Sequence, residues 1–316
     1  MLNKFPLSRY KLTLAAKENL HLPEYSGSTL RGGFGHTFRK IVCVNRDNEC
    51  SGCLLRTKCI YSYIFETSPS VDADKLRKYK DIPRPFIIEP PIESKQTYLK
   101  GETLEFNLIL IGKAICYLPY FIFTFKELGN IGIGRGRGKY ELISLTAIKE
   151  NIEEEIYSSA TGLAKNIDGQ LTMADVLNEV KDYQQDELTL KFITPTRLKH
   201  NGRYILIPEF HILIRSLLSR ISSLAYFHCD EELNVDYRQL IEEAKEVKIK
   251  ERHTGWYDWE RYSSRQETRM NLGGIIGNIT YTGNLSPFLP FIILGKYAHI
   301  GKGATFGLGR YEISKK

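Results

Sequence analysis

The residue best suited to acid and base chemistry in this sequence is His36. It lies in the segment RGGFGHTFRK, residues 31–40, where glycines open a stretch of helical spacing and cations flank the imidazole. A histidine exchanges a proton near neutral pH, so it can act as a general acid or base. The rival is His299, which opens a glycine-rich loop. The alternative for His36 is a helix-surface histidine with local hydrogen bonds.

Two glycine-rich loops resemble each other, one in residues 131–142 and the other in residues 299–313. When Gly138-Lys139-Tyr140-Glu141-Leu142 is aligned with Gly309-Arg310-Tyr311-Glu312-Ile313, Gly136 falls on Gly307. The chain therefore has the pattern of two copies of one unit. Exposed N–H groups and cations suit an anionic backbone; the cations in or beside the loops are Arg135, Arg137, Lys139, Lys302 and Arg310. A plain structural turn is the alternative, and neither loop has a nucleotide-binding signature.

Four cysteines lie within a polar insertion as C-x6-C-x2-C-x5-C, namely Cys43, Cys50, Cys53 and Cys59. Thiolates at these spacings can surround one tetrahedral ion, and zinc is the default. An iron-sulfur cluster requires the same thiols, so the spacing leaves it open. We expect the metal to be structural, because four protein ligands leave no open position for catalysis.

The elements that must position these residues follow a repeated order. Apolar alternation predicts strands in residues 7–22, 104–111 and 140–145, and helical spacing predicts helices in residues 27–43 and 114–128. This is the split βαβ pattern of a ferredoxin-like domain. Strand material at 188–193 and 247–282, an amphipathic helix at 210–226 and a second helix from Pro287 to Leu294 predict a second copy.

The predicted fold class is therefore α+β, with tandem ferredoxin-like domains. We expect an N-terminal domain in residues 1–148 that carries the cysteine insertion, a linker region in 149–186 and a C-terminal domain in 187–316. The linker assignment depends on the acidic, polar composition of residues 150–185.

Composition adds an expectation about partners. The formal net charge is +7, from 44 lysines and arginines against 37 acidic residues, which is consistent with nucleic acid but does not require it. Interleaved aromatic residues and arginines in residues 256–266, including Arg261 and Arg265, suit base stacking and phosphate pairing. No segment has the apolar length of a membrane span, and the N-terminus lacks the apolar core of a signal peptide, so we expect no membrane partner and a cytoplasmic protein.

An ordered set of motifs resembles the CRISPR-associated endoribonucleases of the RAMP superfamily, which process precursor CRISPR RNA. The set comprises LRGGFGH at 30–36, the cysteine insertion, GIGRGRG at 132–138, TPTRL at 194–198, RYSSRQ at 261–266 and the terminal glycine-rich loop.

The resemblance implies RRM-like domains that hold CRISPR repeat RNA, with Arg31 joining the loop cations and Arg261 and Arg265 as RNA-binding residues. It also implies metal-independent cleavage by the ribose 2′-OH, which gives a 2′,3′-cyclic phosphate. His36 matches the position of the family's acid/base histidine, with Lys40 steadying phosphate charge and Tyr25 assisting. Subunits of a CRISPR effector complex are the implied protein partners.

Two other functions are considered from the sequence. One is a noncatalytic RNA-binding subunit of a CRISPR effector complex, in which the same loops hold RNA and His36 is incidental. The other is a metal-stabilised structural protein with no role in RNA binding, which salt-dependent RNA binding would exclude.

Overall fold

The computed structural model describes residues 2–45, 50–67, 82–93, 95–149, 152–162, 165, 169–263 and 268–314, with only the backbone of residues 51, 261–263 and 268–270. The chain divides into two compact units. One contains residues 6–170 and 227–229, and the other contains residues 1–5, 171–226 and 230–316. Each unit is a mixed α/β structure built on an antiparallel sheet.

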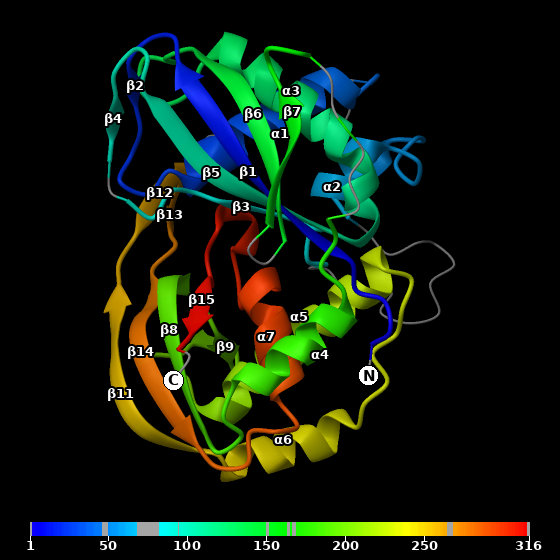
Figure 1. Ribbon diagram of the computed structural model, residues 1–316, viewed down its shortest axis with the longest axis vertical. Helices are drawn as coiled ribbons and strands as arrows, with labels where there is room; N and C mark the ends of the chain where they lie inside the picture. The colour runs from blue at the N-terminus through cyan, green and yellow to red at the C-terminus, as the bar shows by residue number, and fades with distance from the viewer. Residues whose placement is uncertain are drawn as a thin grey trace. The chain divides into compact units, whose positions relative to one another are not determined.

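The first unit is a five-stranded antiparallel sheet in the order β3-β5-β1-β6-β7 (Figure 1). Without the added edge strand β7, this order is consistent with a ferredoxin-like, split βαβ fold. A short β2–β4 pair lies beside the sheet. The elements are β1 (Leu7–Ala16), β2 (Leu20–His21), α1 (Gly27–Val42), α2 (Ile60–Phe65), β3 (Phe86–Glu89), β4 (Thr97–Tyr98), β5 (Thr103–Ile111), α3 (Leu118–Ile131), β6 (Tyr140–Lys149) and β7 (Ile152–Ser158), with 3-10 helices at Cys50–Gly52 and Gly112–Tyr117.

The core of the first unit lies between the sheet and helices α1 and α3. Leu12 of β1 pairs with Phe106 of β5 and with Leu145 of β6, and all three side chains are buried. Phe34 of α1 stacks on Phe121 of α3, with ring centroids 4.8 Å apart. Burying large aromatic side chains contributes strongly to stability, so these contacts fix the rotation of α1 about its own axis.

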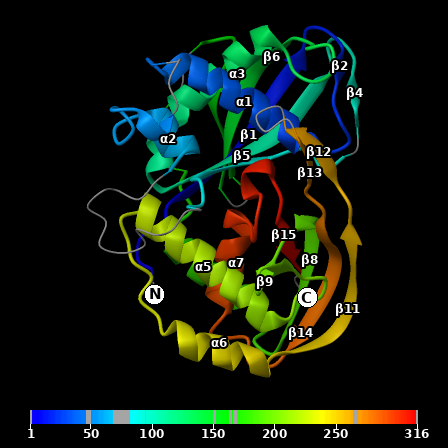
Figure 2. The same ribbon diagram turned by 180° about the vertical axis from the view of Figure 1, so that it is seen from behind.

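The second unit repeats the arrangement with a four-stranded sheet in the order β11-β14-β8-β15, and α5 and α7 lie along it (Figure 2). This order is again consistent with a ferredoxin-like fold. Its elements are α4 (Met173–Glu179), a 3-10 turn (Val180–Asp182), β8 (Glu187–Thr196), β9 (Lys199–His200), β10 (Arg203–Tyr204), α5 (Phe210–His228), α6 (Tyr237–Glu246), β11 (Lys248–Tyr257), β12 (Glu260–Ser263), β13 (Thr268–Asn271), β14 (Gly274–Thr282), α7 (Leu289–Ala298), a 3-10 turn (Ala304–Phe306) and β15 (Tyr311–Ile313).

The region predicted as a linker contains regular structure. Residues 152–158 form β7, which pairs with β6 at the edge of the first sheet, and residues 173–179 form α4. The acidic run at Glu153–Glu155 is compatible with a strand because an edge strand exposes its charged side chains to solvent. Strand β8 also continues through Pro195 to Thr196, beyond the point where the sequence predicts its end. In the described part of the chain, no helix is long and apolar enough to cross a membrane.

Candidate functional site

The position of His36 follows from the packing of helix α1. Phe34 and Phe38 are both fully buried and face the sheet. His36 lies two residues from each, about 200° around a helix of 3.6 residues per turn, so its side chain emerges on the opposite, exposed face. Lys40 is one turn further along the same exposed face. The packing of α1 therefore presents an imidazole and an ammonium group together to solvent.

Cations surround the His36 imidazole from two elements. Partial burial lowers the pKa of His36, and the positive charges of Lys40, Arg137 and Arg39 lower it further. Lys40 and Arg39 belong to α1, whereas Arg137 comes from the first glycine-rich loop. A pKa below the ordinary value leaves the imidazole neutral at neutral pH, which is the form that accepts a proton.

The first glycine-rich loop is folded tightly against neighbouring backbone. The Ile133 N–H donates to the Gly138 carbonyl at 3.0 Å. A Cβ at Gly132 would lie 2.0 Å from the Arg137 carbonyl oxygen, and one at Gly134 would lie 2.2 Å from that of His21. These glycines allow close backbone approach, and the turn they form carries Arg135 and Arg137.

The other predicted RNA-binding residues of the first unit have local contacts. The Arg31 guanidinium lies 5.0 Å from the centre of the Phe65 ring, and Lys139 Nζ lies 3.6 Å from a carboxylate oxygen of Glu18. Tyr25, which is half-buried, lies just before α1. Arg31 and Lys139 are thus on the same unit as His36, each beside a side chain that orients it.

The second glycine-rich loop holds its histidine differently. His299 is fully buried, and its Nδ1 lies 3.0 Å from the carbonyl oxygen of Leu308 in the same loop. Its arrangement favours a role in ordering the loop. Lys302 is exposed, and the Arg310 guanidinium lies 3.7 Å from the Glu312 carboxylate.

The remaining basic residues predicted to bind RNA lie in the β12–β13 region of the second unit. Arg261 is in β12, where only its backbone is described, and Arg265 lies outside the described residues. The contribution of both arginines stays a prediction.

The four cysteines lie along one segment, in which residues 46–49 are outside the described part. Burial raises the pKa of the Cys50 thiol, and the nearby Cys43 and Cys59 add to that rise. Cys43 Sγ donates to the Asn45 carbonyl at 3.3 Å. Among the described residues, no three His, Cys, Asp or Glu side chains are arranged to hold one metal ion. A zinc or iron-sulfur site formed by Cys43, Cys50, Cys53 and Cys59 therefore stays a prediction from their spacing.

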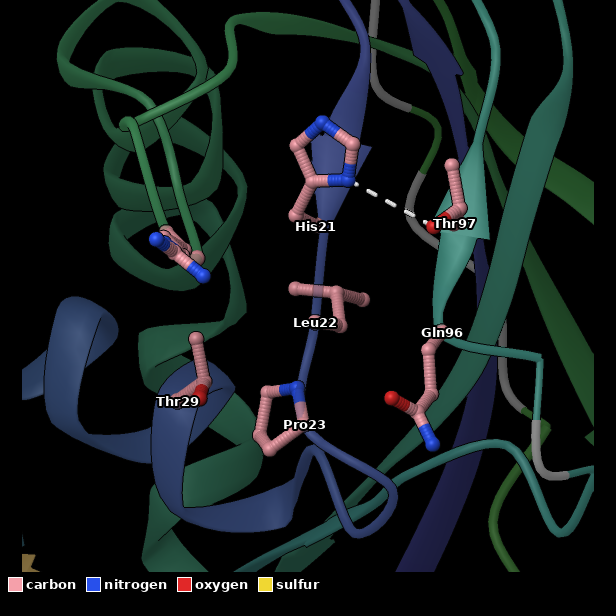
Figure 3. Close-up of a pocket in the computed structure, with 8 residues that line it drawn as sticks. His21, Leu22, Pro23, Thr29, Gln96 and Thr97 are labelled. Atoms are coloured by element: carbon pink, nitrogen blue, oxygen red, sulfur yellow. Dashed lines mark hydrogen bonds between the residues drawn. The ribbon is translucent and has the colours of Figure 1, made fainter.

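One residue beside the site, His21, was not among the site residues predicted from the sequence. His21 lines a cavity of about 490 Å³ together with Arg135 of the glycine-rich loop (Figure 3). The signal was present, because Leu20 and Leu22 alternate as buried residues and direct His21, between them, to the opposite, exposed face.

Comparison with known proteins gives two family matches that lie on successive parts of the chain. A model described as an N-terminal domain matches residues 5–169, and the model of the CRISPR-associated endoribonuclease Cas6 matches residues 190–311. An uncharacterized protein of Archaeoglobus fulgidus is 24% identical in an alignment of 307 positions, which covers 93% of this chain and 93% of that protein.

Two solved structures are similar over nearly the whole chain. A Cas6 product complex has a TM-score of 0.59 and Thermus thermophilus Cas6 has one of 0.55. Each is 15% identical to this chain, and each match covers 98% of this chain and 99% of the other. The C-terminal part of the chain therefore carries the domain of the CRISPR-associated endoribonuclease Cas6, and nearly the whole chain shares the fold of the solved Cas6 proteins.

Proposed function

We propose that this protein is an endoribonuclease that cleaves CRISPR repeat RNA without a catalytic metal, with His36 as the acid/base residue. The observation that carries the proposal is the exposed His36 imidazole, whose pKa is lowered by partial burial and then by Lys40, Arg137 and Arg39. The similar Cas6 chain that was solved as a product complex supports a role for the fold in holding cleaved RNA.

In the proposed reaction the neutral His36 accepts the proton of a ribose 2′-OH. The 2′-oxygen forms a bond to the adjacent phosphorus, the bond from phosphorus to the 5′-oxygen breaks, and that oxygen takes up a proton as it leaves. The products are a 2′,3′-cyclic phosphate and a 5′-OH. Lys40 and Arg137 stabilise the negative charge that develops on the phosphorane, and Tyr25 assists.

Both units contribute to RNA binding in this proposal as RRM-like domains. The first supplies Arg31, Arg135, Arg137 and Lys139, and the second supplies Lys302 and Arg310 with Arg261 and Arg265 of the β12–β13 region. Contacts from cations to phosphates release counterions, so binding should weaken as salt rises. Association with subunits of a CRISPR effector complex stays a prediction.

The test is incubation of the purified protein with labelled repeat RNA in EDTA, beside the same RNA with a 2′-deoxy substitution at the cut position. We expect cleavage at one site in EDTA and none of the deoxy-substituted RNA, since the attacking oxygen is absent there. Cleavage of the deoxy-substituted RNA, or loss of cleavage in EDTA that added metal restores, would contradict the mechanism. Tight binding without cleavage of the normal RNA would identify a noncatalytic subunit.

A further inference from the structure

The cavity beside His21 has the size and lining of a site for a single nucleotide. Its volume is about 490 Å³, within the usual range for small-ligand pockets. Figure 3 shows the segment that carries His21, Leu22 and Pro23 running between Thr29 of α1 and the segment that carries Gln96 and Thr97. Gly134 and Arg135 complete the lining. The three labelled walls belong to the first unit, so the cavity is complete within it.

The lining combines the groups that recognise the parts of a nucleotide. Leu22 and Pro23 supply apolar surface, and the His21 ring offers an aromatic face for a base. The Gln96 amide can donate to and accept from a base edge, as amides do when they read nucleobases. Arg135 supplies a cation for phosphate. A purely apolar ligand would not use Gln96 or Arg135, and a purely cationic ligand would not use the apolar surface of Leu22 and Pro23.

The walls of the cavity are held together by direct hydrogen bonds. The Arg135 N–H donates to the His21 carbonyl at 2.8 Å, and the Leu22 N–H donates to the Gln96 carbonyl at 2.7 Å. His21 Nδ1 lies 3.4 Å from Thr97 Oγ1, which orients the ring. A preformed site binds without first ordering its parts, so these bonds favour binding.

We propose that this cavity binds one unpaired nucleotide of the repeat RNA, beside the phosphate that is cleaved. Arg135 contacts the phosphate, the His21 ring stacks on the base, and Gln96 hydrogen-bonds to the base edge. The location relative to the cleaved bond follows from the glycine-rich loop, because Arg135 lines the cavity and Arg137, two residues later, interacts with His36. The inference rests on the proposed function for its choice of RNA as the ligand.

The test measures binding of repeat RNAs in which each position in turn is abasic, all with the 2′-deoxy substitution that blocks cleavage. For the natural protein we expect one position near the cut at which loss of the base weakens binding about tenfold. A variant with His21→Ala and Gln96→Leu should bind the intact RNA about tenfold more weakly and be insensitive to base loss at that position. Both side chains are exposed, so the fold should persist.

Leu99→Ala is the matched control. Leu99 is exposed and close in sequence to Gln96 but does not line the cavity, and this variant should keep the natural abasic profile. The inference is overturned if the double variant keeps the natural profile or weakens binding equally at every position. If the natural protein binds the repeat no better than a scrambled RNA, the proposed function itself fails, whereas a flat abasic profile with tight binding overturns the nucleotide site alone.

Discussion

Replacing His36 with alanine is expected to abolish most cleavage of repeat RNA while leaving RNA binding intact. A positioned general acid or base contributes about a hundredfold to ten-thousandfold to a rate, which corresponds to about 3 to 5 kcal/mol of transition-state stabilisation. His36 is exposed on the face of α1 opposite Phe34 and Phe38, so its removal should cost little stability. Single-turnover cleavage with excess protein measures the rate, and fluorescence anisotropy with deoxy-substituted RNA measures binding.

The charges around His36 predict how the cleavage rate depends on pH, so repeating the experiment across pH tests the same assignment a second time. Partial burial has the largest effect in lowering the pKa of His36 below its ordinary value of 6.5, and repulsion from Lys40, Arg137 and Arg39 lowers it further. A general base works when deprotonated, so the rate should rise with pH, reach half of its maximum below pH 6.5 and level off above that point. Lys40→Gln removes one repelling charge, which raises the pKa and moves the rising limb to higher pH.

Lys126→Gln is the charge-matched control for that shift. Lys126 is exposed on α3, and its Nζ lies over the Tyr157 ring; it is not among the groups that lower the pKa of His36. Its replacement should leave the pH at which the cleavage rate rises unchanged. The assignment of His36 as the base would be refuted if the cleavage rate of Lys40→Gln rose at the same pH as that of the natural protein. It would also be refuted if His36→Ala cleaved at the natural rate.

Three further predictions concern stability and use urea denaturation. Gly134→Ala should destabilise the protein by about 2 kcal/mol or more, because φ is +71° and the new Cβ would meet the His21 carbonyl at 2.2 Å. Gly136→Ala is the control: φ is +82° there but the space around it is open, so it should cost only about 1 kcal/mol. Equal losses of stability in the two variants would refute the steric argument. Tyr311→Phe removes a buried O–H that donates to the Ile292 carbonyl, so it should cost about 1 kcal/mol, whereas the exposed Tyr204→Phe should cost nothing measurable. Glu179 accepts hydrogen bonds from Lys296 and from the Tyr297 hydroxyl. Burial alone would raise the pKa of Glu179, but these bonds outweigh burial and lower the pKa below 4.5. The stability that the bonds supply is therefore present above pH 4.5 and is lost as the pH falls further. Glu179→Gln should therefore cost about 2 kcal/mol at neutral pH and flatten this acid dependence.

The elements that could be predicted from the sequence are those whose side chains alternate or repeat strongly. The predicted helix at residues 27–43 corresponds to α1, Gly27–Val42, because Leu30, Phe34 and Phe38 repeat at helical spacing and all become buried. The strand predicted at 104–111 corresponds to β5 for the same kind of reason, since Leu104, Phe106 and Leu108 alternate toward the core. The spacing of apolar residues predicts these elements reliably because one face of each element is buried.

The elements that were missed lack a one-sided apolar pattern. Strand β7 carries consecutive glutamates and is held in place by pairing with β6. Residues 20–21 of β2 lie within the strand predicted at 7–22, but their pairing with β4 was missed, since this pair has two residues on each side and joins segments far apart in the sequence. Such pairing depends on the fold of the intervening chain, so no local pattern encodes it. The cavity could therefore not be predicted from the sequence, although the exposure of His21 could.

The internal repeat explains why the glycine-rich loops look alike yet differ in their chemistry. The aligned Gly136 and Gly307 both have φ of +82°, and the aligned Tyr140 and Tyr311 both begin a strand and donate a buried hydroxyl to a carbonyl of the preceding helix. What the two copies share is therefore the geometry that returns the chain from a helix to the sheet, and this geometry requires glycine at a left-handed position.

The side chains that the two loops carry have diverged. In the second unit, His299 is buried and bonded within its own loop, and the Arg310 guanidinium lies beside the carboxylate of Glu312. In the first unit, the loop places Arg137 where its charge acts on an exposed histidine and places Arg135 in the wall of a cavity. A loop whose polar groups are satisfied internally can hold RNA or stabilise the fold, but acid/base chemistry needs a histidine that substrate can reach. The duplication thus supplies one structural solution twice, and the observed contacts favour the first copy as the catalytic one.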